Sequence, residues 1–181
     1  MKRIIAHLIR GEAKTAHENI TKDLVEKFDS FPLHERIPPH LTLKRWFEFD
    51  QKGMDDLYKC IDWFTNSHKQ SDYTLTGFGH FGTDVIYADV LASAEMKGDV
   101  LEFIGALHGV DGMTWDEFDN GGNFHATVAM GALKPFDYDQ IWNYLQAGTQ
   151  PNFKMKFDNI AVLKRENERW VVERVFEIEA Q

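Results

Sequence analysis

The sequence is short of cysteine, of long apolar runs and of basic residues, and each shortage excludes a class of protein. Its single cysteine, Cys60, excludes an internal disulfide framework and is typical of a reducing cytoplasm, where we expect the protein to reside. No apolar run approaches the roughly 20 residues that span a bilayer, so no membrane association is expected. Residues 1–10 are apolar only briefly and are interrupted by His7, which predicts a first strand rather than a signal peptide.

Basic residues are outnumbered by acidic ones. The chain has 20 lysines and arginines against 29 aspartates and glutamates, a net charge of −9, and no basic run exceeds two residues. Nonspecific binding of long nucleic acid requires basic patches that displace counterions. We therefore expect no long nucleic-acid partner, and expect any phosphate-bearing substrate to be small, or the end of a chain, bound in a local pocket.

One pattern occurs twice. The sequence His-Leu-Thr-Leu starts at His40, and His-Ala-Thr-Val starts at His125, 85 residues later. Successive side chains of a strand point to opposite faces, so His40 shares a face with Thr42, and His125 with Thr127, while the apolar residues face a core. Each motif thus sets a proton-transfer group beside a hydroxyl that is able to bind an anion.

The rest of the chain shows alternating strand and helix patterns. A double proline excludes helix immediately before the first motif. The mixed order of hairpins and helices predicts an α+β fold with largely antiparallel sheet, forming one domain over residues 1–181. The paired motifs suggest duplication of a small helix-and-strand unit. Strands are predicted over residues 2–10, 40–49, 73–81, 84–91, 124–133, 153–165 and 170–180, and helices over 13–29, 54–68, 94–108 and 138–147.

The paired motifs resemble those of the 2H phosphoesterase superfamily, which includes 2′-5′ RNA ligases and 2′,3′-cyclic-nucleotide phosphodiesterases. A glycine-and-aromatic hairpin over 76–90 and a closing hairpin over 160–176 also resemble this superfamily. The resemblance implies a bilobal α+β fold of two antiparallel-rich sheets with outer helices, in which a pseudo-twofold axis relates the motif strands. It also implies catalytic roles for His40, Thr42, His125 and Thr127.

The same residues indicate a chemistry without reference to any family. Opening a cyclic phosphodiester requires one proton to leave water and another to reach the departing ribose oxygen. Two imidazoles with ordinary pKa values of about 6.5 perform both transfers near neutral pH, and threonine hydroxyls stabilise the phosphate oxygens. No cofactor or metal is required, and the sequence contains neither a His-Glu-x-x-His run nor a cysteine pair. Which histidine is the acid stays open.

Two further residues are predicted to bind substrate. Under strict two-residue alternation, Lys44 joins the motif face as the pocket's cation, whereas Arg45 points away. Trp115, in a glycine-bracketed acidic loop, is the preferred aromatic for stacking on a base, ahead of candidates such as Trp46 and Phe81.

The leading prediction is a metal-independent phosphoesterase that hydrolyses a 2′,3′-cyclic or 2′-5′-linked ribonucleotide phosphodiester. The alternatives are a non-catalytic module that binds nucleotide or phosphate, 2′-5′ RNA ligation as the reverse chemistry, and a metal-dependent hydrolase. The oligomeric state is left open. Among the other histidines, His7 and His17 are expected to have surface or capping roles, and His80 is the one considered for the cleft.

Overall fold

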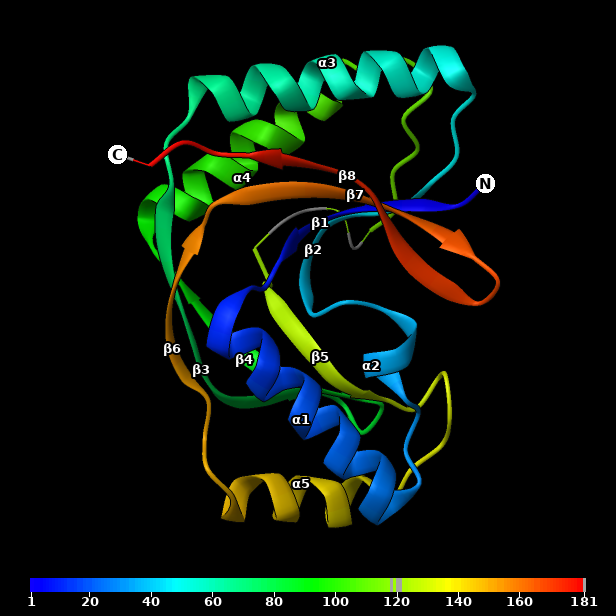
Figure 1. Ribbon diagram of the computed structural model, residues 1–181, viewed down its shortest axis with the longest axis vertical. Helices are drawn as coiled ribbons and strands as arrows, with labels where there is room; N and C mark the ends of the chain where they lie inside the picture. The colour runs from blue at the N-terminus through cyan, green and yellow to red at the C-terminus, as the bar shows by residue number, and fades with distance from the viewer. Residues whose placement is uncertain (118, 120–121, 181) are drawn as a thin grey trace.

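The computed structural model describes residues 1–117, 119 and 122–180, which form two four-stranded antiparallel sheets with helices packed on them (Figure 1). In spatial order the first sheet contains β2 (His40–Phe47), β1 (Arg3–Leu8), β7 (Asn159–Glu166) and β8 (Arg169–Glu177). The second contains β5 (His125–Met130), β4 (Val85–Ala92), β3 (Ser71–Phe81) and β6 (Asn152–Phe157). This architecture confirms the predicted α+β class with two antiparallel sheets.

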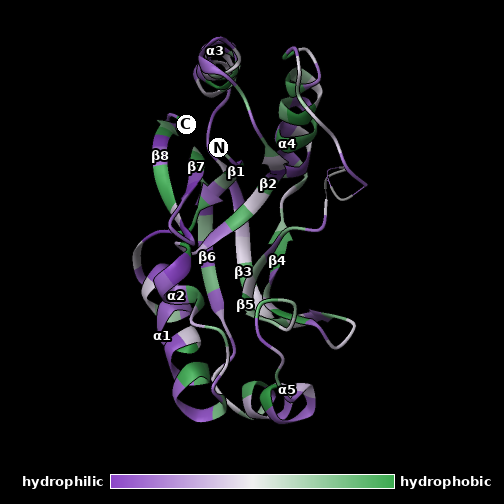
Figure 2. Ribbon diagram, turned by 90° about the vertical axis from the view of Figure 1, so that its right-hand side faces the viewer, coloured by the Kyte–Doolittle hydropathy of each residue, from purple (hydrophilic) through white to green (hydrophobic). Residues whose placement is uncertain are grey.

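The helices gather at the two ends of the molecule. Figure 2 shows α3 and α4 at one end and α5 at the other, with α1 and α2 beside the strands in the half of the molecule that contains α5. None of the helices in the described ranges is long and apolar enough to cross a bilayer. Their bounds are α1 (Gly11–Phe28), α2 (Leu33–Arg36), α3 (Gln51–Ser67), α4 (Ala94–Leu107) and α5 (Tyr138–Ala147).

Local sequence explains where these helices begin and which side they bury. The side chains of Asp50, Ser93 and Asp137 accept hydrogen bonds from backbone N–H groups in the first turns of α3, α4 and α5. Such caps satisfy donors that have no partner within the helix, and each contributes about 1 kcal/mol. On α3, Leu57 and Ile61 lie on the predicted apolar stripe and are fully buried. The helix therefore covers the core face of the first sheet.

Two details differ from the predicted elements. The single strand predicted over 153–165 is two strands, because the chain leaves the second sheet after β6 and enters the first as β7. The change occurs at Asp158, and the Asn159 side chain fixes it by donating to the carbonyl of Leu8 and accepting from the Leu8 N–H. An alternating apolar pattern without interruption does not indicate that the chain passes from one sheet to the other. In addition, the predicted loop over 31–39 contains the short helix α2.

A buried histidine connects the two sheets. His7 on β1 is 1% exposed, its Nδ1 donates to the Asn159 carbonyl at 3.0 Å, and its Nε2 accepts from the Tyr73 hydroxyl on β3 at 2.9 Å. Burial lowers the pKa of His7 to about 4, although the hydrogen bond to Asn159 opposes this shift, so the ring is neutral at neutral pH. The surface or capping role expected for His7 is therefore wrong.

Candidate active site

The two motifs lie on the outer strands of the two sheets. β2 is an edge of the first sheet, β5 is an edge of the second, and the two strands lie close to each other. In each motif the histidine and the threonine are half-buried, while the apolar residues between and after them are buried. The predicted alternation therefore holds across both motifs, and it puts His40 and His125 at the starts of neighbouring strands.

Both motif imidazoles are held in the same way. The Nδ1 of His40 lies 2.9 Å from the carbonyl oxygen of Pro38, and the Nδ1 of His125 lies 2.7 Å from that of Asn123. Because a carbonyl only accepts, each Nδ1 carries the proton and donates to the carbonyl two residues earlier. The neutral ring therefore presents Nε2 as its basic nitrogen in both motifs.

The surroundings favour the neutral form of both rings. Burial lowers the pKa of His40 to about 4, the hydrogen bond to Pro38 opposes this shift, and the charges of His17 and His125 lower the pKa further. Burial also lowers the pKa of His125, against the effect of its hydrogen bond to Asn123. Because charges interact appreciably only at short range through solvent, the effect of His17 and His125 on His40 places His40 in the neighbourhood of both.

Aromatic rings flank His125. The Phe81 ring meets the His125 imidazole edge-on at 4.9 Å between centroids, and the Tyr87 ring lies 5.2 Å from it. Phe81 is 39% exposed. Tyr87 crosses over Gly79 of the paired strand, where a Cβ atom would lie 2.5 Å from the tyrosine ring. This contact explains why the hairpin combines glycine with aromatic residues.

Lys44 does not lie on the motif face. In the pairing of β2 with β1, Thr42 is opposite Ala6 and Lys44 is opposite Ile5, so Leu43 and Lys44 together face the single residue Ile5. This β-bulge interrupts the alternation. Leu43 and Lys44 are consequently both buried on the core side of the strand. The prediction that Lys44 is the pocket's cation is corrected by this bulge.

Trp115 lies beside a buried ion pair that Lys44 forms. The Lys44 ammonium donates to the Asp119 carboxylate at 2.8 Å and to the Arg45 carbonyl at 3.0 Å, and the Lys44 and Asp119 side chains are each 1% exposed. The Trp115 ring lies 5.3 Å from that ammonium and stacks on His108 at 3.8 Å between centroids. The structure thus groups both predicted substrate-binding residues with Asp119, in a contact that ties the loop before β5 to β2.

A second bulge in β2 turns the residues after Lys44 toward the face that carries His40 and Thr42. Lys44 is opposite Ile5 and Phe47 is opposite Arg3, so the two residues between them, Arg45 and Trp46, both face Ile4. Ile4 lies two residues from Ala6, the partner of Thr42, and therefore shares the motif face. Arg45 is thus on the same face as His40 and Thr42, contrary to the direction that strict alternation predicts.

One histidine that was expected at the surface belongs to the site. His17 on α1 is 9% exposed, and its Nε2 donates to the carbonyl of Thr127 at 2.9 Å. Burial lowers the pKa of His17 to about 4, opposed by hydrogen bonding to the β5 backbone. The surface or capping role expected for it is wrong. Its spacing from Ala13 and Leu24 puts it on the buried stripe of α1, a signal the sequence does contain.

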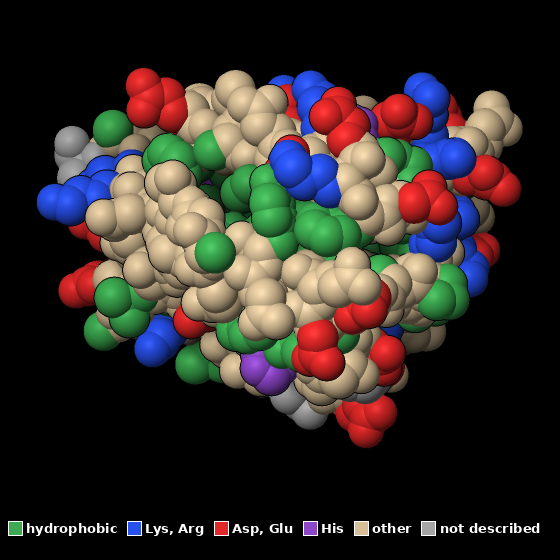
Figure 3. All heavy atoms as spheres, turned by 90° about the horizontal axis from the view of Figure 1, so that it is seen from below, with side chains coloured by type: hydrophobic (Ala, Val, Ile, Leu, Met, Phe, Trp, Pro, Cys, Tyr) green, Lys and Arg blue, Asp and Glu red, His purple; other side chains and the backbone are tan. Residues whose placement is uncertain are grey.

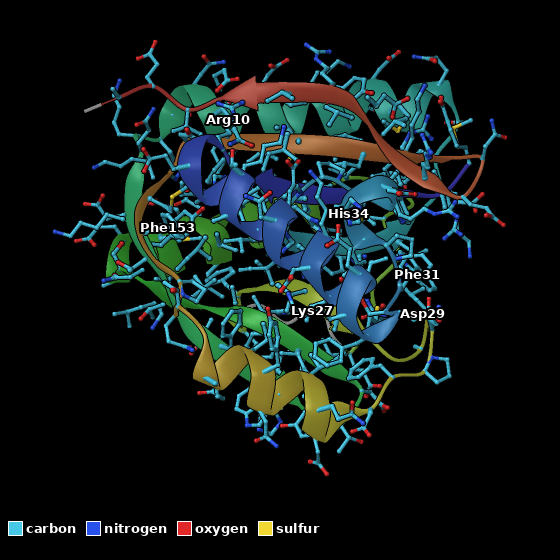
Figure 4. The ribbon with its side chains drawn as sticks, turned by 60° about the horizontal axis from the view of Figure 1, so that its bottom comes forward. Arg10, Lys27, Asp29, Phe31, His34 and Phe153 are labelled. Atoms are coloured by element: carbon cyan, nitrogen blue, oxygen red, sulfur yellow. The ribbon has the colours of Figure 1, made fainter. Side chains whose placement is uncertain are left out.

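An apolar hollow of about 190 Å³ adjoins the other side of His17. Figure 3 shows hydrophobic side chains lining a hollow on the face seen from below, and Figure 4 shows Phe153 on one side of α1, with Phe31 and His34 on the other. This lining offers a phosphate no cation, so the motif strands are the better candidate site. The lining residues are Ala13, Ala16, His17, Ile20, Leu75, Ala88, Thr149, Gln150, Pro151 and Phe153.

A comparison with protein families decides the relationship. The model of the 2′-5′ RNA ligase superfamily matches residues 13–169. The chain belongs to the 2′-5′ RNA ligase superfamily. This membership supports a phosphoesterase-type or ligase-type enzyme, and agrees with the 2H motifs found in the sequence. No curated protein matches the sequence.

Solved structures show the superfamily fold. The chain resembles the protein TT0787 of Thermus thermophilus, with a TM-score of 0.72, 16% identity and 100% of both chains covered. It resembles E. coli LigT complexed with 3′-AMP at a TM-score of 0.60 and 13% identity, covering 98% of this chain and 97% of that one. Usb1 of Kluyveromyces marxianus gives a TM-score of 0.52 and 12% identity, with 98% and 97% covered. At these identities the likeness concerns the fold alone.

Proposed function

We propose that the protein is a metal-independent phosphoesterase that hydrolyses a 2′,3′-cyclic or 2′-5′-linked ribonucleotide phosphodiester, with His40 and His125 as its acid–base pair. The observation that carries this proposal is the matched fixing of the two imidazoles on adjoining edge strands. Membership of the 2′-5′ RNA ligase superfamily supports it. So do the nucleotides in the LigT structures, which were solved with 3′-AMP, NADP⁺ and ATP.

The reaction assigns a task to each motif residue. One neutral imidazole takes a proton from water through Nε2 as the water oxygen attacks phosphorus. The second imidazole, protonated, donates to the ribose oxygen as its bond to phosphorus breaks, which leaves a phosphomonoester and a free hydroxyl. The hydroxyls of Thr42 and Thr127 donate to the non-bridging phosphate oxygens, where negative charge must be stabilised.

The aromatic rings beside His125 support a nucleotide as substrate. Phe81 is partly exposed and contacts the catalytic ring, so its free surface offers a stacking partner for a base whose phosphodiester lies at the imidazoles. Stacking tolerates any base because every base has a π face. We therefore expect little preference among the four nucleobases.

A turnover assay on 2′,3′-cyclic mononucleotides in excess chelator tests the proposal. Hydrolysis to a monoester is expected to proceed unchanged in chelator, because the two histidines supply both proton transfers. Binding of the cyclic nucleotides without turnover would establish the non-catalytic module instead. Activity that chelator abolishes would establish a metal hydrolase, and joining of RNA ends without hydrolysis would establish the ligase.

The lowered pKa values of both histidines predict an acidic optimum. The free enzyme is active when one imidazole is protonated and the other is neutral, a state most populated between the two pKa values. The pKa of His40 is about 4 and that of His125 lies below its ordinary value. We expect kcat/KM to peak below pH 6.5 and to fall tenfold per pH unit on the alkaline side. Rates would be measured only where circular dichroism shows an intact fold; a peak above pH 7 would contradict this.

His17 is expected to position Thr127 through the backbone. His17→Leu removes the donor to the Thr127 carbonyl on an edge strand, so we expect kcat to fall about 10²-fold while KM changes little. His17→Gln keeps an N–H at the position of Nε2 and is expected to restore most of the loss. Steady-state kinetics of the two variants measure the difference.

Thr21 provides the matched control for this experiment. It is fully buried one turn further along α1, and its hydroxyl donates to Glu18 within the helix. Thr21→Val therefore disturbs the same helix but removes a hydrogen bond within α1 rather than one to β5, and its kcat should stay within a few-fold of the parent. Equal losses in His17→Leu, His17→Gln and Thr21→Val would show that His17 serves packing alone.

A further inference from the structure

The second bulge of β2 creates a feature that the proposed chemistry does not use. It turns Arg45 and Trp46 toward the motif face, opposite Ile4. Bulges next to active sites commonly re-aim side chains. Arg45 is partly exposed and Trp46 is 54% exposed, although an indole of this size is usually well buried. The motif strand therefore presents a large aromatic surface to solvent on the side where His40 and Thr42 lie.

Cations surround this indole in a chain that is acidic overall. The Lys2 ammonium lies 4.7 Å from the centroid of the Trp46 ring, and the Arg45 guanidinium carbon lies 5.6 Å from it. Arg45 also approaches Asp116, at 3.7 Å. An exposed aromatic ring beside lysine and arginine matches the two needs of single-stranded nucleic acid, a stacking surface for a base and positive charge for its phosphate.

The distance from His40 to Trp46 indicates which nucleotide of the substrate this aromatic surface would bind. In the pairing with β1, His40 is opposite Leu8 and Trp46 is opposite Ile4, four residues away. At about 3.3 Å per residue the two side chains are separated by about 13 Å along the sheet. The nucleotide whose phosphodiester reacts has Phe81, beside His125, as its stacking partner. A base stacked on Trp46 therefore belongs to the neighbouring nucleotide.

We propose that Lys2, Arg45 and Trp46, here called the Trp46 platform, bind the nucleotide that precedes a 3′-terminal 2′,3′-cyclic phosphate. The substrate class is then the end of an RNA strand rather than a free mononucleotide. This inference rests on the proposed function and narrows its substrate. It agrees with the charge of the whole chain, because a local platform holds a strand end where an acidic surface would repel a longer strand.

The test compares two substrates that differ only in length. A cyclic mononucleotide reaches the histidines alone, whereas a tetranucleotide ending in a 2′,3′-cyclic phosphate also reaches the platform. Base–aromatic stacking contributes about 1–3 kcal/mol, so Trp46→Ala is expected to lower kcat/KM for the tetranucleotide by about 5- to 150-fold and to leave kcat/KM for the mononucleotide unchanged. Trp46→Phe, which keeps an aromatic face, should retain most of the tetranucleotide rate.

Trp63 is the matched control. It is 50% exposed on α3, which packs on the core face of the first sheet, away from the motif face. Trp63→Ala is expected to leave kcat/KM unchanged for both substrates. The platform is refuted if Trp46→Ala leaves kcat/KM for the tetranucleotide unchanged. It is also refuted if Trp46→Ala lowers kcat/KM equally for both substrates, because that outcome would mean a structural role for Trp46.

A binding measurement separates this inference from the proposed function. If the parent protein turns over neither substrate, the proposed function fails, and the platform is then judged by the affinity for a tetranucleotide that ends in a 3′-phosphate. Weaker binding of that tetranucleotide by Trp46→Ala, with unchanged binding of 3′-AMP, supports the platform. Unchanged binding of both overturns it. Lys2→Ala is expected to reduce the salt dependence of tetranucleotide binding, because one phosphate contact is lost.

Discussion

Replacing His40 or His125 with alanine is expected to lower kcat for a 2′,3′-cyclic nucleotide by about 10²–10⁴-fold in each case. Each substitution removes one of the two proton transfers and leaves the hydroxyls of Thr42 and Thr127 in place to bind the phosphate. KM should therefore change much less than kcat. Because acid and base act in one transition state, the double variant should lose little more than the worse single variant. Steady-state kinetics of the three variants measure these effects.

His80 offers a matched control for the catalytic pair. Its Nδ1 lies 2.9 Å from the carbonyl of Gly82, two residues away, which is the same kind of contact that fixes both motif rings. It lies on the hairpin next to Phe81 and is exposed. His80→Ala should leave kcat unchanged. Full activity in His40→Ala or His125→Ala would remove the acid–base assignment, and a loss in His80→Ala equal to theirs would extend the site to the hairpin.

The sequence allowed the motif faces to be predicted because alternation is local. Each motif spans four residues without a bulge, so the two-residue period places histidine and threonine together. The nearness of the two motifs was predictable only through their repetition and through the family resemblance. Their actual juxtaposition depends on each strand being the outer one of its sheet, and strand order follows from long-range pairing that local patterns do not specify.

The wrong predictions for β2 concern residues at which strand pairing interrupts the two-residue alternation of side chains. Two bulges within the eight residues of β2 send Lys44 to the core and turn Arg45 outward, and no residue in the run marks them, since neither glycine nor proline is present. His7 and His17 were expected at the surface because histidine is often exposed. Both are instead buried donors to backbone carbonyls, and each connects one structural element to another. Sequence patterns identify apolar stripes more readily than polar residues that lie within them.

Asp119→Asn is expected to destabilise the protein by about 3–5 kcal/mol. The substitution keeps the shape of the side chain but leaves the buried Lys44 ammonium without a compensating charge. Burial on its own would raise the pKa of Asp119, yet hydrogen bonds from Lys44 and from the N–H groups of Asp116 and Arg45 outweigh it and hold the pKa below its ordinary value. The carboxylate is therefore ionised and stabilising at neutral pH, and this contribution is lost as the pH falls through the folded pKa. Urea denaturation measures the change.

The double variant Lys44→Met/Asp119→Asn distinguishes a missing charge partner from a general disturbance. It contains no buried charge at this place, so it should recover part of the stability that Asp119→Asn loses, and a double-mutant cycle gives the coupling. Glu179→Gln breaks the exposed pair with Lys69 and should cost no more than about 1 kcal/mol. Equal losses in Asp119→Asn and Glu179→Gln would contradict the role of the buried pair. Because this pair ties the loop before β5 to β2, Asp119→Asn should also lower kcat in protein that is still folded.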